Sequence, residues 1–342
     1  MQYRLLKLGL IGVLALAVFA AGIMGNGRSR AFAQDMAHNT YMVHAGGFGE
    51  ANVEILAFAP AYLQVHRGDT VMWHVTSFHN MRFGEQEEPF IIVEDMNGTP
   101  TPIGNPNVFF PTQPSGTAYT GGDANSGLPS EDALKGFYSL VMDVEPGLYS
   151  YRCDVHPGMA GIIEVVADDV AIPSPSEVDA MAAKELDDQI NPAILAYFAS
   201  SATAPTQSAD GSITILAGIG GTGRASSLSF ASPLVFIKAG ETVTWQVPAD
   251  SPTPHFVNSI PFDPAAVPDI IPQENAGGPP TLLAGPGFLG TTPDGATISA
   301  GAAFNSIFLA PGQSFSLVFA DPGVYPYICH VHPGMGGAVI VQ

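Results

Sequence analysis

A seven-residue segment that occurs twice constrains this chain more than any other feature. The segments are Cys153-Asp-Val-His156-Pro-Gly-Met159 and Cys329-His-Val-His332-Pro-Gly-Met335, and their cysteines lie 176 positions apart. Each segment places a thiol, an imidazole and a thioether on one short loop. A thiolate, imidazoles and a distant thioether form a donor set that copper prefers. The repeated spacing therefore predicts two copper sites of one kind.

A further histidine precedes each segment at the same distance. His79 lies 74 residues before Cys153, and His255 lies 74 residues before Cys329. Similar runs come before these histidines, namely Gly68-Asp-Thr-Val-Met-Trp73 and Gly240-Glu-Thr-Val-Thr-Trp245. Agreement at a fixed offset indicates an internal repeat. We interpret the chain as a tandem duplication.

A predicted β-strand ends at each cysteine. In the first copy, strict alternation places Tyr149, Tyr151 and Cys153 on one face and Ser150 and Arg152 on the other. A Pro-Gly pair before the strand indicates a turn, and the same pattern precedes the second cysteine. The loop after the strand is so short that its histidine and methionine fold back toward the cysteine.

These motifs resemble the cupredoxin family of blue type 1 copper proteins, which includes plastocyanin, pseudoazurin and amicyanin. The pattern Gly-[Asp/Glu]-Thr-Val-x-Trp and the short Cys-x2-His-x2-Met loop carry the resemblance, and the short loop is most similar to amicyanin. The resemblance covers residues 40–166 and 212–342. It implies an all-β protein of two tandem Greek-key β-sandwiches, joined by a short helical linker, with copper at one end of each sandwich.

The resemblance also implies the ligands of each copper. They are His79, Cys153, His156 and Met159 in the first copy, and His255, Cys329, His332 and Met335 in the second. Cysteine provides the strongly coupled bond to the metal, the histidines hold a geometry suited to both oxidation states, and methionine tunes the potential. Structural roles remain the alternative for these residues, since buried free thiols and core-filling methionines are common. Trp73 and Trp245 are interpreted as core residues.

The N-terminal residues indicate export. Arg4 and Lys7 precede an apolar run, and Ala31-Phe-Ala33 fits a signal-peptidase site, so residues 1–33 are interpreted as a signal peptide. An uncleaved membrane anchor is the alternative. The protein is expected in the periplasm or outside the cell. Each of its two cysteines lies in its own metal-type loop, so metal ligation is favoured over a disulfide.

The remaining organisation follows from the repeat and from composition. Domain 1 is expected over residues 36–167, a linker with a helix over 168–211, and domain 2 over 212–342. The helix is expected from Glu177 with Ser176 as its cap, and Asn191-Pro192 is expected to break it. Each copy carries an insertion, near Glu85–Leu134 and Pro261–Ala303, whose Gly and Pro content predicts long loops.

These features favour one-electron transfer over bond-making chemistry. The formal net charge is −20, and removal of the signal peptide with its four basic residues lowers it to −24. Such an acidic surface disfavours nucleic acid and would attract a basic redox partner protein. Solubility in a salty or acidic setting would also explain the charge. A homotrimer is an oligomeric state to test, because two-domain copper proteins that resemble this chain form trimers.

Two other functions stay open. His330 directly follows Cys329 and faces away from the predicted copper, as does the histidine that binds a catalytic type 2 copper in nitrite reductases and multicopper oxidases. The four other unassigned histidines (His38, His44, His66 and His74) are too few for a trinuclear cluster but enough for a mononuclear site. Nitrite reductases carry the corresponding histidine directly before the cysteine of the first domain. In this chain that position is Arg152, which disfavours an enzyme. Copper storage is disfavoured because the 11 methionines are scattered.

Overall fold

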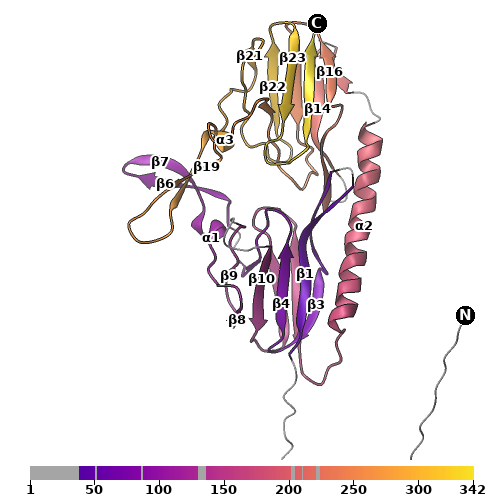
Figure 1. The fold of residues 1–342 in the computed structure, drawn as a ribbon, viewed down its shortest axis with the longest axis vertical. Helices are drawn as coiled ribbons and strands as arrows, with labels where there is room; N and C mark the ends of the chain where they lie inside the picture. The colour runs from indigo at the N-terminus through magenta and orange to yellow at the C-terminus, as the bar shows by residue number, and fades with distance from the viewer. Residues whose placement is uncertain are drawn as a thin grey trace, which may run out of the picture. The chain divides into compact units, whose positions relative to one another are not determined.

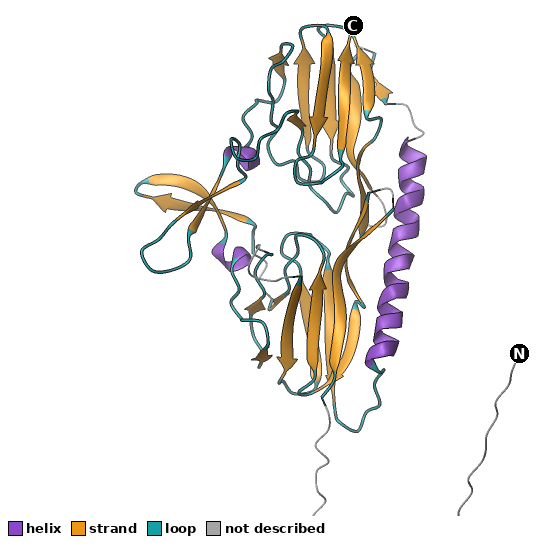
Figure 2. Ribbon diagram, viewed as in Figure 1, coloured by secondary structure: helices purple, strands orange, loops and turns teal. Residues whose placement is uncertain are grey.

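The computed structural model describes residues 38–50, 52–85, 88–129, 136–201, 205–209, 211–220 and 224–342. The predicted signal peptide lies outside the described residues. Residues His38–Gln342 form one compact unit. Strands dominate this unit (Figure 2), which confirms the predicted all-β class.

The first half, residues 38–166, is a β-sandwich. Two layers of five strands enclose a core in which Trp73 is fully buried. One layer consists of β1 (Thr40–Gly49), β2 (Val53–Ala59), β4 (Thr70–Val75), β8 (Thr117–Tyr119) and β10 (Phe137–Met142). The other layer consists of β3 (Tyr62–His66), β5 (Arg82–Phe83), β9 (Ala124–Asn125), β11 (Gly147–Arg152) and β12 (Ala160–Val166).

The second half, residues 206–342, repeats this arrangement around the fully buried Trp245. Strand β1 pairs antiparallel with β2 and parallel with β4, and β14 pairs in the same way with β15 and β17. One layer consists of β13 (Thr206–Gln207), β14 (Ile213–Gly220), β15 (Ala225–Phe230), β17 (Thr242–Gln246), β21 (Ala296–Ile298) and β22 (Ser314–Phe319). The other consists of β16 (Leu234–Ile237), β18 (Asn258–Ser259), β23 (Gly323–Ile328) and β24 (Gly336–Val341).

One layer of each sandwich continues into the other half. Strand β2 pairs antiparallel with β15, with Glu54 opposite Ser226. Backbone bonds run from Leu56 N–H to Arg224 O (2.7 Å) and from Leu228 N–H to Asn52 O (2.8 Å). The two layers thereby form one hydrogen-bonded sheet. We call the pairing of β2 with β15 the seam.

The linker helix is longer and more regular than expected. Helix α2 (Pro175–Ser201) runs without interruption through Pro192 and contacts β1, β2, β14 and β15 (Figure 1). The predicted break at Asn191-Pro192 is therefore wrong, because packing along both halves outweighs the one helical hydrogen bond that proline removes. The cap is also Ser174, not Ser176, since the Ser174 N–H donates to the Glu177 carboxylate at 2.8 Å.

The insertions contain strands, so the prediction of long loops is only partly right. Their strands β19, β20, β7 and β6 form a four-stranded sheet, in which Leu283 of the second insertion pairs with Ile103 of the first (Figure 1). Each insertion then makes a single helical turn. The elements are β6 (Ile91–Met96), β7 (Thr99–Gly104), α1 (Pro106–Phe109), β19 (Ile270–Gln273), β20 (Thr281–Ala284) and α3 (Pro286–Leu289).

Candidate metal centres

The fold brings His79, Cys153 and His156 together in the first half. His79 follows β4, Cys153 lies at the end of β11, and His156 lies on the following loop. The two Nδ1 atoms are 3.0 Å apart, and Cys153 Sγ lies 3.9 Å from His79 Nδ1 and 3.7 Å from His156 Nδ1. Both imidazoles present the same nitrogen to the thiol, so one metal ion between them would reach all three donors.

The second half repeats this geometry. His255 and His332 place their Nδ1 atoms 3.1 Å apart, and Cys329 Sγ lies 3.2 Å from His332 Nδ1. In each half, the three donor atoms lie within 4.8 Å of one another. Within the part of the chain that the structure describes, these are the only such groups of three His, Cys, Asp or Glu donors.

Met159 and Met335 end the two loops that begin at Cys153 and Cys329. Both are buried, and each loop is closed by a backbone bond from the cysteine N–H to the methionine carbonyl, at 2.9 Å in the first half and 3.0 Å in the second. The predicted axial role of the two thioethers stays a prediction, as does the assignment of the eight residues as ligands.

Burial sets the protonation of these groups without metal. It lowers the pKa of His79 to about 3 and, with the charge of His330 as a smaller cause, that of His332 to about 4. Burial also raises the pKa of Cys153 to about 11 and that of Cys329 to about 12. At neutral pH the imidazoles are therefore neutral, as a metal requires, while each thiol must lose its proton on binding.

A backbone N–H also supports each cysteine sulfur. The Phe256 N–H donates to Cys329 Sγ at 3.4 Å, and a backbone bond from Asn80 lowers the Cys153 pKa against the effect of burial. Both donors directly follow the first histidine of their site. Such bonds stabilise a thiolate, so the donor set of two imidazoles and one thiolate fits a type 1 copper ion in both halves.

A glycine lies against the first histidine in each half, and the sequence analysis missed both. A Cβ on Gly46 would lie 2.3 Å from His79 Nε2, and one on Gly218 would lie 2.2 Å from His255 Nε2. Both glycines have φ of +79° and lie where the strand register shifts. Their recurrence 172 positions apart was the signal that could have identified them.

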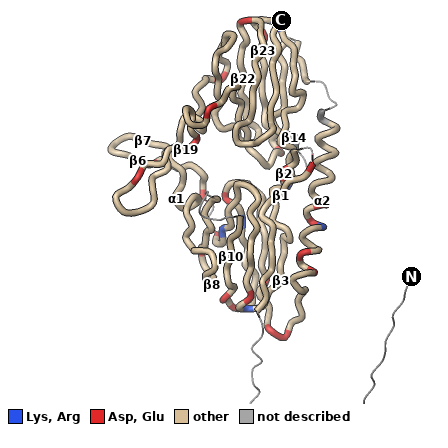
Figure 3. Tube along the Cα trace, in the orientation of Figure 1, with Lys and Arg blue, Asp and Glu red and all other residues tan. Residues whose placement is uncertain are grey.

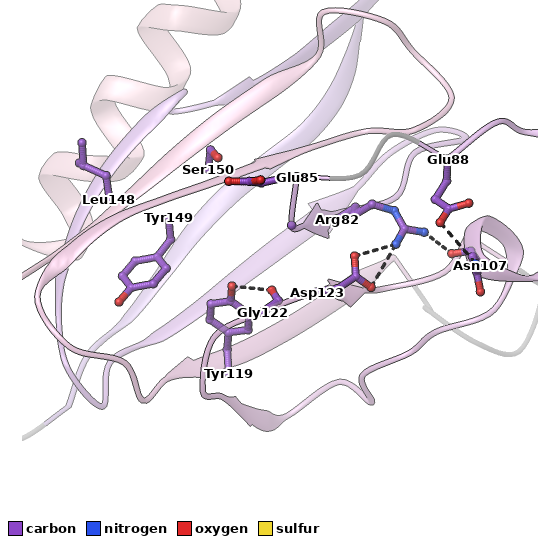
Figure 4. Close-up of a pocket in the computed structure, with 11 residues that line it drawn as sticks. Arg82, Glu85, Glu88, Asn107, Tyr119, Gly122, Asp123, Leu148, Tyr149 and Ser150 are labelled. Carbon is purple, nitrogen blue, oxygen red and sulfur yellow. Dashed lines mark hydrogen bonds and ion pairs between the residues drawn. The ribbon is translucent and has the colours of Figure 1, made fainter.

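A buried ionic network ties His79 and Cys153 together through their neighbours. Asn80 Oδ1 accepts from the Asp154 N–H at 2.8 Å, and Asn80 Nδ2 donates to the Asp154 carboxylate at 2.8 Å. Arg82, almost fully buried, donates to the same carboxylate at 2.6 Å and also to Asp123 and to the Asn107 carbonyl (Figure 4). No sequence pattern around Asn80, Arg82 or Asp154 predicts this network.

The second half lacks the ion pair, because Asn258 and His330 occupy the places of Arg82 and Asp154. His330 Nδ1 lies 2.7 Å from Asn258 Oδ1, and its Nε2 lies 2.8 Å from Asp269. Phe256 and Phe262 flank the imidazole, both at 4.5 Å between ring centroids. Both nitrogens of His330 therefore face protein oxygens.

The other histidines do not join His330. His44 lies edge-on to His74, His66 Nε2 lies 2.9 Å from the Val170 carbonyl, and His38 lies 4.0 Å from Asp69. The described residues thus contain no group of three His, Cys, Asp or Glu donors around His330.

Residues 219–342 match the family model of copper binding proteins of the plastocyanin/azurin family. Among solved structures, a Cu(I) amicyanin variant is 22% identical and aligns over 39% of this chain and 85% of its own, with a TM-score of 0.23. A purple cupredoxin from Nitrosopumilus maritimus is 26% identical over 38% of this chain and 98% of its own, also at 0.23. These scores are too low to add to the family match. No curated protein matches the chain.

Proposed function

We propose that this chain is an electron-transfer protein with one type 1 copper in each half, since residues 219–342 match the family model of copper binding proteins of the plastocyanin/azurin family. One observation carries the proposal. The same set of two Nδ1 atoms and one Sγ converges twice in buried pockets, including in the half that the family model does not cover.

The chain's own residues explain how such a site would serve electron transfer. Bound copper supplies a one-electron couple between Cu(II) and Cu(I). The first histidine of each site packs against Gly46 or Gly218, and the second histidine lies on the closed Cys–Met loop. A pocket that fixes its donors in this way changes little between oxidation states, which keeps the reorganisation small.

The partner and location are part of the same proposal. A basic redox protein would be attracted by the net charge of −20, and in Figure 3 few positions along the chain are coloured as Lys or Arg compared with those coloured as Asp or Glu. Export to the periplasm or the outside is proposed from residues 1–33, and the mass of the protein recovered from a periplasmic fraction would test it. No helix in the described ranges has the length and apolar character needed to cross a membrane.

The test is copper stoichiometry together with an EPR spectrum of the oxidised, copper-loaded protein without residues 1–33. Two coppers per chain, both with the narrow hyperfine splitting of thiolate-bound copper, are expected. A third copper with wide splitting would show a type 2 site and replace this proposal with a copper oxidoreductase. One copper per chain would restrict the proposal to a single half.

A further inference from the structure

A cavity of about 720 Å³ lies between the two halves, and both candidate metal centres border it. His156 of the first half and His332 of the second both line it. We call this space, which one histidine of each candidate centre borders, the inter-half cavity.

Phenylalanine side chains from both halves line the cavity. The first half contributes Phe78, Phe90 and Phe109, and the second contributes Phe256, Phe262, Phe288 and Phe308. Phe90 and Phe288, one from each insertion, lie 5.8 Å apart between ring centroids. The insertions, which the cupredoxin resemblance leaves unexplained, thus wall off the space between the two sites. A cavity of this size with aromatic walls suits a small molecule rather than a protein surface.

Two buried polar atoms of lining residues, Thr253 Oγ1 and Glu54 Oε2, have no hydrogen-bond partner among the residues that the structure describes. Thr253 is fully buried, and its hydroxyl makes no hydrogen bond there. Glu54, 2% exposed, accepts from the Ser77 hydroxyl through Oε1 at 2.5 Å, but its Oε2 is unpaired. Thr253 and Glu54 come from opposite halves, and both line the cavity. Unsatisfied buried polar groups are costly, so each is a point where a ligand would form a hydrogen bond.

We infer that the inter-half cavity binds a planar aromatic molecule bearing hydroxyl groups, stacked on the phenylalanine rings and hydrogen-bonded to Thr253 and Glu54. Ring faces favour a flat aromatic ligand over a flexible acyl chain, because offset stacking adds to burial of apolar surface. Burial raises the Glu54 pKa, against the smaller lowering effect of the Ser77 hydrogen bond. Binding needs no copper. Only the use of such a ligand for electron exchange rests on the proposed function.

The test uses copper-free protein and 2-naphthol as the probe, followed by its fluorescence. One saturable site per chain is expected, with cyclohexanol failing to compete. Phe78→Ala and Phe90→Ala should each weaken binding roughly 3- to 10-fold, as expected for the loss of one stacking partner. Phe236→Ala is the matched control, since Phe236 is 58% exposed on β16 and does not line the cavity.

A second comparison separates the hydrogen bond from the apolar contact. Thr253→Val should weaken 2-naphthol binding and leave binding of naphthalene unchanged. Absence of saturable binding to the wild-type chain, or equal binding by all four variants, would overturn the inference. Stronger displacement of 2-naphthol by octanol than by 1-naphthol would assign the cavity to acyl chains instead. Circular dichroism and copper uptake of each variant show separately whether it folds and whether the metal centres survive.

Discussion

The Nδ1 atoms of His79 and His156 face each other at 3.0 Å inside a pocket that excludes solvent. Burial lowers the pKa of both imidazoles, so a proton on each ring at once is strongly disfavoured. Two neutral imidazoles can share one proton between these nitrogens, and a metal ion can bind both nitrogens once that proton has moved to Nε2 of its own ring. The pocket thus favours one cation bound by both imidazoles over two positively charged histidines.

This protonation state predicts the number of protons that metal binding releases. Cu(I) added anaerobically to the copper-free protein should release about one proton per ion, from the cysteine, at every pH between about 5.5 and 8.5. The histidines release none, because their lowered pKa values leave them neutral throughout this range, and the raised cysteine pKa values keep both thiols protonated. A pH-stat titration measures the release. If the histidines had ordinary pKa values, the number of protons released per ion would instead rise toward three as the pH falls to 5.5.

Cysteine replacement should separate the two centres. Cys153→Ser removes one thiolate and should abolish the narrow-splitting EPR signal of the first half only, and Cys329→Ser should do so for the second half. Each variant is the control for the other, because the remaining centre keeps all three of its donors. Survival of both signals in either variant would show that the ligand assignment is wrong.

Gly46→Ala should lower both the free energy of unfolding and copper retention by the first centre. The loss should exceed the strain of placing an alanine at a positive φ. The new Cβ would meet His79 Nε2 at 2.3 Å. Gly98→Ala is the matched control, since Gly98 has φ of +83° but no atom within 4 Å of the added carbon. The control should lower the free energy of unfolding by about 1–2 kcal/mol, and Gly46→Ala should lower it further. Urea unfolding of the copper-free proteins and copper retention measure the two effects.

Asp154→Ala should lower the free energy of unfolding by about 3–5 kcal/mol, because it leaves the buried Arg82 without its closest carboxylate. The double variant Arg82→Met with Asp154→Leu should recover part of that loss, since no unpaired charge then remains. Denaturant unfolding at neutral pH is the measurement. A loss below about 1 kcal/mol for Asp154→Ala would mean that Asp123 alone satisfies Arg82.

Local chemistry made much of the site predictable from the sequence. The strand ending at Cys153 alternates as expected, with Tyr151 buried and Ser150 exposed. The loop that follows is so short that His156 must lie close to Cys153. Trp73 and Trp245 are buried as predicted, because large apolar residues on an alternating strand face the core.

Features that depend on contacts between the halves were not predictable. The seam joins Glu54 to Ser226, and no local pattern near either residue indicates an inter-half partner. The pairing of Leu283 with Ile103 likewise joins two insertions that the sequence presents only as Gly- and Pro-rich segments. Local propensity predicts that Pro192 breaks the helix, because it does not include the packing of α2 along both halves.

The seam also has a consequence for how this protein comes apart. Neither half can unfold without stripping an edge of the other's sheet, and α2 packs on strands of both. The chain therefore has two cores but is expected to melt in one transition. A copper ion bound in either half would then stabilise the whole chain, and a single empty centre would weaken residues far from it.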